Sequence, residues 1–520
     1  ASNYNSDLFT DIFKYISHMS GKVYRGTLPK DPRDMSAQEL TDCVFRVLAD
    51  HVRTLTFSIA DGIIPGNEGR NYVLRRILRR AVMYGKRLGL ERGFFTKLTE
   101  PVIEKMSPFF PELKEQRKMI VKTIEAEETS FARTLDRGLE LLDRITTTDG
   151  KISGEQAFAL YDTFGFPIDL TELIARERNM PVDTEGFERE MEKQRKRARD
   201  AQTRKVISVS DLSEAGHATQ FIGYSSDNLA NFTTTISAIL EDEDTDYIIL
   251  PQTPFYAEKG GQVGDTGFIE IDGVAHEVID TKADNADHIL HKVRKGAFKS
   301  GMVGREVVVS VDCLRRRAIQ RHHTATHILH WAMRQVLGTH IRQAGSYVDA
   351  ERLRFDFTHY EAPTPEQLEE IERLANAKIL MNEPVKWRVL PRNEVPPECM
   401  ALFSEKYGAV VRMVEVGSFS KELCGGTHVA ALGEIGFIKI LGEGAISAGT
   451  RRIEAVAGVA ALNRVDKMQS TLGEVSRALS CKPEEASARL KKLVEAKNEL
   501  ERELKNFRKE SAGKLAKSLA

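Results

Sequence analysis

The sequence predicts a multidomain protein of mixed α and α+β class, with a helical domain, a small glycine-rich β-barrel, an α+β domain and a C-terminal helical, coiled-coil-like segment. Three observations lead to this fold class. The chain has 520 residues, more than one hydrophobic core organises. Its N-terminal part carries helical periodicity, and short β-like runs separated by glycine turns follow it. We place the domains at residues 1–205, 206–310, 311–460 and 461–520.

The first domain is predicted to be helical. Ser36 and Glu39 form a capping-box pattern before the apolar-periodic run 39–55. A second helix is expected over 72–90, where basic side chains occupy one arc and apolar side chains the opposite arc. The basic arc holds Arg75, Arg76, Arg79, Arg80, Lys86 and Arg87. A charged helix over 187–205 is expected to end this domain.

The later domains have different patterns. Runs such as GFIEIDG and REVVVSVD predict strands of the barrel, and helical and strand patterns mix in the α+β domain. In the C-terminal segment, apolar side chains at heptad a and d spacing predict a short coiled-coil-like seam that Lys497 interrupts. The seam is formed by Leu490, Leu493, Leu500, Leu504 and Phe507. We expect self-association through this segment.

Composition excludes several classes of protein. The net charge is −1, so a globally basic nucleic-acid binder is not indicated. The sequence has no apolar run of about 18 residues, and it begins without a secretory signal pattern, so we expect no membrane contact. The five cysteines are scattered and odd in number, which favours a reducing, cytoplasmic location over a disulfide scaffold.

The segment RHHTATHILH, residues 321–330, contains four of the thirteen histidines. His323 and His327 are four positions apart in a helical pattern, which places both rings on one helix face. This pair alone is weak evidence of a metal site, because histidines also serve as ordinary half-buried residues. His322 and His330 have no assigned role, and we expect solvent or structural contacts for both.

A second pair lies in KELCGGTHVA, where Cys424 and His428 are also four positions apart and flank two glycines. Three imidazoles and one thiolate suit a single zinc ion, and glycines permit the tight backbone that convergence needs. The alternative is a buried small Cys424 and a capping His428. A zinc protease is disfavoured, because Thr324, Ala325 and Thr326 separate the helical pair where a glutamate would be needed.

The motifs HHTATH and CGGTH, with TPFYAEKGGQVGDTG and GTRRIEAVAG, resemble the editing domain of alanyl-tRNA synthetases. The segments ADGIIPGNEGRNYVLRRILRRAV and ALYDTFGFPIDLT resemble the tRNA-recognition region of the same family. The resemblance covers essentially the whole chain. RLGLER at 87–92 is similar to a class II motif but has Arg87 in place of a glycine, and we interpret it as a coincidence within the basic helix. We therefore expect a part of a synthetase that lacks the class II aminoacylation core.

The resemblance implies a function and a set of site residues. Serine or glycine would be hydrolysed from mischarged tRNA(Ala) at the zinc site, with Thr326 and Gln343, and also Thr324, beside the aminoacyl group. Asn67 and Asp169 would recognise a G·U wobble pair, with Asn71 as the alternative to Asn67. Phosphate contacts would come from Arg75, Arg76, Arg79 and Arg80. ATP and magnesium would serve only the full-length ligase. The alternative function is a non-catalytic tRNA-binding module with a structural zinc.

Overall fold

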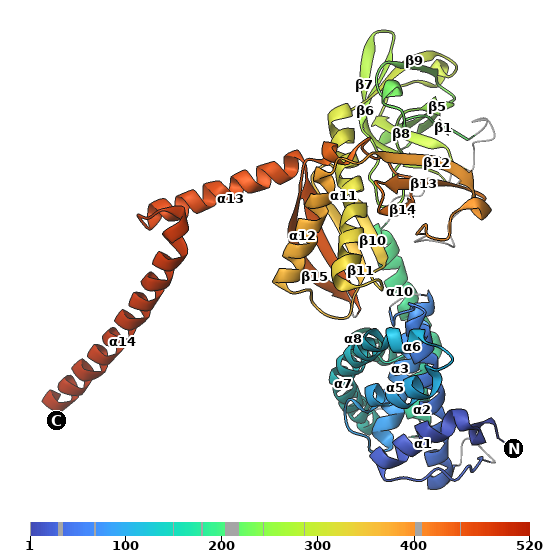
Figure 1. Ribbon diagram of the computed structural model, residues 1–520, viewed down its shortest axis with the longest axis vertical. Helices are drawn as coiled ribbons and strands as arrows, with labels where there is room; N and C mark the ends of the chain where they lie inside the picture. The colour runs from blue at the N-terminus through green and yellow to red at the C-terminus, as the bar shows by residue number, and fades with distance from the viewer. Residues whose placement is uncertain are drawn as a thin grey trace.

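The computed structural model describes residues 2–29, 35–66, 69–148, 150–177, 180–202, 218–242, 244–284, 286–400, 408–447 and 449–519. Figure 1 shows a helical N-terminal domain, a mixed α/β part, and two C-terminal helices that leave it on one side. The multidomain α/β class predicted from the sequence is confirmed. None of the described helices combines the length and apolar character needed to span a membrane.

The N-terminal domain is built from helices around one hydrophobic core. They are α1 (Asp7–Ser20), α2 (Ala37–Ala60), α3 (Gly69–Arg87), α4 (Phe94–Lys97), α5 (Thr99–Met106), α6 (Glu112–Glu115), α7 (Arg117–Thr148), α8 (Gly154–Phe164), α9 (Ile168–Glu177) and α10 (Thr184–Gln202), after a short 3-10 helix η1 (Asn3–Asn5). The capping box at the start of α2 is confirmed, because Ser36 Oγ accepts from Glu39 N and Glu39 Oε2 accepts from Ser36 N.

Helix α3 ends earlier than the sequence pattern predicts. The helix stops at Arg87, and Gly89 takes a positive φ of 85°, which a glycine adopts without steric cost. The amide of Leu90 then donates to the carbonyl of Gly85 at 3.0 Å. The segment RLGLER therefore lies mostly in the turn after α3, and our placement of it inside the helix was wrong.

The next domain is β-rich. Its strands are β1 (Gln220–Phe221), β2 (Phe232–Thr235), β3 (Ala238–Glu241), β4 (Thr245–Ile249), β5 (Gln252–Thr253), β6 (Gly267–Ile271), β7 (Val274–Ala283), β8 (Ile289–Arg294) and β9 (Glu306–Val311), with 3-10 helices η3 (Ser226–Asn228) and η4 (Ser300–Met302). Seven strands form one antiparallel sheet in the order β2-β9-β6-β7-β8-β4-β3. Among the described residues this sheet does not close on itself, so it is a half-barrel and not the closed barrel predicted from the glycine turns.

The α+β part packs two helices against sheets. Its elements are α11 (Cys313–Leu337), β10 (Gln343–Val348), β11 (Leu353–Thr358), α12 (Pro365–Leu380), β12 (Val385–Pro391), η5 (Arg392–Glu394), β13 (Val410–Val416), β14 (Ser420–Leu423), η7 (Leu432–Ile435), β15 (Ile438–Ser447) and β16 (Thr450–Ala457). One sheet has the order β10-β11-β16-β15 and a smaller one the order β12-β13-β14. Ile328 and Leu329 of α11 are fully buried against this core, which fixes the helix that carries the histidines.

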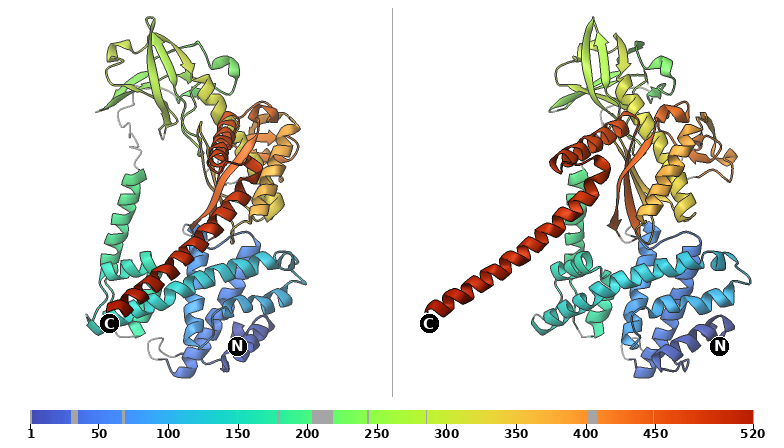
Figure 2. Two further views of the ribbon diagram at one scale, coloured as in Figure 1. Left: turned by 90° about the vertical axis from the view of Figure 1, so that its left-hand side faces the viewer. Right: turned by 60° about the vertical axis from the view of Figure 1, so that its left-hand side comes forward.

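Two helices, α13 (Val459–Ala478) and α14 (Ala486–Leu519), follow the last strand, with η8 (Pro483–Glu485) between them. Figure 2 shows that α14 extends away from the rest of the molecule. Its predicted seam residues are exposed, as are several apolar residues of α13. These helices therefore present apolar side chains that the described chain does not cover.

Candidate functional site

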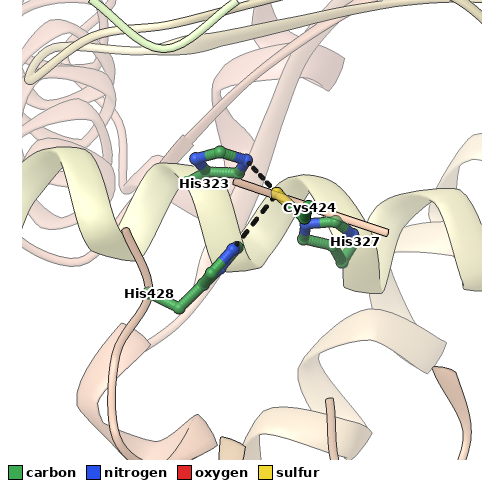
Figure 3. Close-up of side chains that lie close together, drawn as sticks. All are labelled: His323, His327, Cys424 and His428. Atoms are coloured by element: carbon green, nitrogen blue, oxygen red, sulfur yellow. Dashed lines mark hydrogen bonds between the residues drawn. The ribbon is translucent and has the colours of Figure 1, made fainter. Parts of the chain in front are cut away.

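The predicted ligands come from two elements that meet in the α+β core. Helix α11 holds His323 and His327 one turn apart, with parallel rings 5.5 Å between centroids. The turn after β14 brings Cys424 and His428 to them, as Figure 3 shows. One nitrogen or sulfur atom of each side chain lies within 4.8 Å of all the others. The structure thus brings together all four side chains that the sequence predicted as metal ligands.

The two glycines of this turn have different roles. A Cβ atom on Gly426 would lie 1.9 Å from Cε1 of His323, whereas one on Gly425 would meet nothing within 4 Å. Neither glycine has a positive φ. Gly426 is therefore required for close approach to the histidine ring and not for an unusual backbone conformation.

Each histidine of the cluster is held through its Nδ1 atom. His323 Nδ1 lies 2.7 Å from Gln262 Oε1, and His327 Nδ1 lies 2.8 Å from Glu422 Oε2. His428 Nδ1 lies 3.2 Å from Thr324 Oγ1. With the Nδ1 hydrogens donated to these oxygens, the Nε2 atoms are left as ligands, which is the usual arrangement around a metal-binding histidine.

The donor atoms fit a zinc ion. Cys424 Sγ lies 3.3 Å from His323 Nε2 and 3.4 Å from His428 Nε2. Tetrahedral zinc with nitrogen and sulfur ligands spaces such atoms roughly 3.3–3.7 Å apart. The Nε2 atom of His327 is buried and has no hydrogen-bond partner in the part of the chain that the structure describes. A buried polar atom costs free energy without a partner, and a metal ion would supply one.

Charge in the cluster also favours a cation. Burial opposes ionisation of the Cys424 thiol, but the imidazoles of His323 and His428 lower its pKa well below the usual value. Burial likewise opposes ionisation of Glu422, yet His327 beside it lowers the pKa of the carboxyl group. The site therefore holds a Cys424 thiolate, which can bind a metal ion, and a Glu422 carboxylate, which supports the ligand His327.

The other two histidines of α11 are structural. His322 Nε2 accepts from the amide of Ala457 at 3.0 Å, and burial lowers the pKa of this side chain to about 4. His330 lies between Glu422 and the ring of Phe355. Two of the four histidines therefore face the cluster and two fix α11 to its surroundings, as we expected.

A cavity of about 760 Å³ opens beside the cluster and is lined by His323, His327 and Cys424. Thr326 and Gln343, which the sequence singled out, also line it. The Thr326 hydroxyl donates to the carbonyl of His322 at 2.9 Å, and the Gln343 amide donates to Ser346 Oγ at 2.9 Å. Both residues are therefore placed where a ligand of this cavity would contact them.

Sequence reasoning missed two residues of the site. Gln262 lies in GGQVGDTG, which we interpreted only as turns of the barrel, and Gly260 and Gly261 of the same segment line the cavity. Glu422 stands two positions before Cys424 and bonds His327. A metal-binding histidine donates the hydrogen of its second ring nitrogen to an acceptor. A carboxylate or amide close to a predicted ligand pair is therefore the signal that could have identified both residues.

The arginines of α3 are not all on the surface. Arg75 is only 5% exposed, and with Arg79 it neutralises the buried carboxylate of Glu127. Arg79 Nη1 also donates to the carbonyl of Gly165 at 2.6 Å. The predicted basic arc therefore does not lie wholly in solvent, because the buried Glu127 of α7 takes two of its arginines as partners. Arg80 remains exposed.

Asp169 lies at the N-terminal end of α9 and forms an ion pair of 3.1 Å with Arg76. Its second oxygen, Oδ1, is buried and has no hydrogen-bond partner among the described residues. Arg76 borders a cavity of about 450 Å³ between α3, α7 and α8. Asn67, the other residue predicted to recognise the wobble pair, lies outside the described residues.

Comparison with known proteins agrees with this arrangement. A family model of class II tRNA synthetases (A) matches residues 1–315, and the model of the second additional domain of threonyl and alanyl tRNA synthetases matches residues 411–454. The second match contains Cys424 and His428. The chain thus belongs to the class II tRNA synthetases and carries a second additional domain.

The curated relatives narrow the family further. The alanine–tRNA ligase of Opitutus terrae is 44% identical over all of this chain and 58% of its own length. That of Methylococcus capsulatus is 42% identical over all of this chain and 59% of its own length. The chain belongs to the alanyl-tRNA synthetase family, and it spans about three-fifths of the length of these relatives.

The match to the class II family model concerns the prediction that this chain lacks an aminoacylation core. It covers residues 1–315, so this chain carries part of the class II region. The described elements before β1 are helices. That the chain lacks the aminoacylation core stays a prediction.

Proposed function

We propose that this chain is the part of an alanine–tRNA ligase that binds tRNA(Ala) and hydrolyses Ser-tRNA(Ala) and Gly-tRNA(Ala). The observation that carries the proposal is the four-ligand cluster at the wall of a cavity with Thr326 and Gln343 on its lining. An alanine site cannot strongly reject glycine or serine, which differ from alanine by one small group, so a second hydrolytic site is needed.

One zinc ion would be held by His323, His327, Cys424 and His428, and it would supply Lewis-acid chemistry for ester hydrolysis. Gln262 and Glu422 keep two of the rings in the ligating orientation through their Nδ1 atoms. His323 and His327 are buried, which strengthens the electrostatic interactions of their rings, whereas Cys424 and His428 are only half-buried.

Selection of serine would come from the polar lining of the cavity. The Gln343 amide nitrogen is engaged by Ser346, which leaves its carbonyl oxygen to accept from a substrate hydroxyl. Alanine would leave this oxygen unpaired, and such a loss discriminates between the two amino acids. Glycine has no hydroxyl either, so its hydrolysis would depend on how the ester is positioned.

Binding of tRNA(Ala) is assigned to the helical domain. The unpartnered Oδ1 of Asp169 can accept from a base edge, and Asn67 would supply the amide that complements it. Phosphate contacts are assigned to Arg76 and Arg80, because Arg75 and Arg79 are committed to Glu127. The exposed apolar seam of α14 would allow self-association.

A second candidate function is a tRNA-binding module whose zinc is structural. Four protein ligands around one ion make a closed site, and closed zinc sites are usually structural. In the ligase as a whole, ATP and magnesium would serve the attachment of alanine. We expect no alanine-dependent ATP–pyrophosphate exchange by this chain, and exchange above background would show that it contains an active aminoacylation core.

A deacylation assay separates the two candidate functions. The zinc-loaded protein is incubated with Ser-tRNA(Ala), Gly-tRNA(Ala) and Ala-tRNA(Ala). Loss of serine and glycine, with alanine retained, supports the hydrolase. If all three esters persist although the protein binds the tRNA, the module with a structural zinc is the better description.

A further inference from the structure

A second cavity lies on the other side of the Cys424–His428 turn and has no place in the function proposed so far. Its volume is about 610 Å³, and its lining includes Thr427 and His428 of that turn. Arg412 of β13 lines both this cavity and the one beside the metal cluster. The two cavities therefore share one wall.

One side of the second cavity is aromatic. Trp387 of β12 and Tyr224 have ring centroids 5.3 Å apart, and the Arg412 guanidinium lies 4.0 Å from the Tyr224 centroid and 4.8 Å from that of Trp387. Arg412 also donates to the carbonyls of Cys424 and Gly426, so its position is fixed. Trp387 is nevertheless 46% exposed, which leaves part of its indole for another planar group.

Another part of the lining carries arginines, together with Glu434. Arg317 and Arg321 lie four positions apart on α11 and both line the cavity. Arg317 is exposed and has no ion pair or hydrogen bond among the described residues, and Arg321 uses only its Nε atom, which donates to the carbonyl of Glu434 at 2.8 Å. Guanidinium groups with unused donors suit phosphate oxygens, which accept two parallel hydrogen bonds.

We propose that this cavity binds one nucleotide of a single-stranded RNA, with its base on Trp387 and its phosphate on Arg317 and Arg321. An aromatic face beside unpaired cations is the combination by which proteins hold unpaired nucleotides. The proposal rests on the proposed function for its RNA, since the two cavities adjoin at Arg412 and an RNA strand bound at the metal cavity would lie close to this one.

Trp387 provides the test. The chain has two tryptophans, so a Trp331→Phe protein reports from Trp387 alone. Titration with the ribotrinucleotide CCA should quench this fluorescence to saturation, and an abasic ribose-phosphate trimer of equal charge should not quench it. Absence of quenching by CCA at millimolar concentration would overturn the proposal.

Variants test both halves of the site on the same background. Arg317→Ala should weaken CCA binding and reduce the salt slope, log Kobs against log[salt], by about 0.7, which is the effect of one lost phosphate contact on a single strand. Trp387→Leu should weaken binding of fluorescently labelled CCA about tenfold, as expected for one lost base stack. Arg388→Ala, on the same strand but paired with Glu415, is the matched control and should leave both values unchanged.

The Ser-tRNA(Ala) deacylation assay, run on the zinc-loaded unmodified protein, separates this inference from the proposed function. Quenching without deacylation leaves the nucleotide site standing and refutes the hydrolase. Deacylation without quenching refutes the nucleotide site alone. An unchanged salt slope in Arg317→Ala, or capture of acidic peptides in preference to CCA, would also contradict an RNA site.

Discussion

At the scale of single residues, the metal cluster depends on atoms that are not ligands. Gln262, Glu422 and Thr324 each engage the Nδ1 atom of one histidine and so decide which nitrogen faces the ion. Glu422 belongs to β14, whereas Gln262 comes from the β-rich segment before β6. The half-barrel sheet and the α+β core therefore build one site together.

We expect Glu422→Gln to weaken zinc binding by about 10–100-fold, because a neutral amide supports the His327 imidazole less well than a carboxylate does. Competition with a chromophoric chelator measures this affinity. Glu415→Gln is the matched control, since Glu415 pairs with Arg388 on the exposed side of β13. Equal zinc affinity in the two variants would show that Glu422 does not support the site.

We expect Asp169→Ala to weaken discrimination of a wobble from a Watson–Crick acceptor stem more than it weakens tRNA(Ala) binding as a whole. Its free Oδ1 is suited to a base edge. Binding to paired transcripts measures the ratio. Asp162→Ala is the control, because Asp162 lines the cavity that Arg76 borders and accepts a hydrogen bond from Gln194. An Asp169 variant that keeps its discrimination would withdraw the base-reading role.

The arginines of α3 lead to a different expectation. Arg80→Ala should weaken binding of any acceptor stem and lower its salt dependence, because phosphate contacts are independent of sequence. Arg75→Ala should instead destabilise the fold, since it removes a partner from the buried Glu127. Thermal unfolding alongside the binding titration distinguishes the two effects. A stable Arg75→Ala protein with reduced tRNA affinity would contradict this division.

At the scale of elements, the half-barrel sheet contains a buried histidine. His291 of β8 is fully buried, with Nδ1 2.8 Å from the carbonyl of Ile248 and Nε2 2.7 Å from Thr253 Oγ1. Burial lowers the pKa of His291 from 6.5 to about 4. The neutral ring, with Nδ1–H as donor and Nε2 as acceptor, satisfies both contacts.

Because the folded pKa is below the unfolded value, the contribution of His291 is complete above pH 6.5 and is lost as the pH falls toward 4. The loss amounts to at most about 3 kcal/mol, at 1.36 kcal/mol per pKa unit. Urea unfolding between pH 7.5 and 4 measures it. We expect His291→Gln to lower stability at pH 7.5 and to flatten its decline with pH. A variant with the same pH slope as the parent would contradict the assignment.

Elements also show what the sequence could predict. Capping at Ser36, the helical pair His323 and His327, and the change from helices to strands follow from local patterns, and the structure confirms them. Closure of the sheet, the burial of Arg75 and the partners of His323 depend on residues far apart in the chain. Glu127 is about fifty positions from Arg75, and no local pattern reports that contact.

At the scale of the whole molecule, the helical domain contacts the α+β core through α7 and through the turn after α2. Lys122 of α7 pairs with Glu361 and lies over the ring of Tyr360. Gly62, at a φ of 85°, lies against the guanidinium of Arg342, where a Cβ atom would come within 2.8 Å of Nη2. The proposed tRNA contacts and the metal cavity thus belong to two domains that contact each other here.

The C-terminal helix α14 carries its apolar seam into solvent, and the exposed fractions of Leu493 and Leu500 are 57% and 64%. We expect self-association at tens of micromolar, because burying such a stripe is favourable in water. Sedimentation velocity measures it. Leu493→Lys with Leu500→Lys should give monomers, and Asn498→Lys, which lies off the seam, should not. Identical sedimentation of all three proteins would contradict a role for the seam.

The central claim is that the cluster of Cys424 with the three histidines performs hydrolysis. The most direct test is the rate of Ser-tRNA(Ala) deacylation by Cys424→Ala, measured beside Cys43→Ala as a control cysteine outside the cluster. We predict that Cys424→Ala loses bound zinc and all deacylation while tRNA affinity stays nearly unchanged, and that Cys43→Ala keeps all three properties. Hydrolysis of Ser-tRNA(Ala) by Cys424→Ala at the parental rate would contradict the claim.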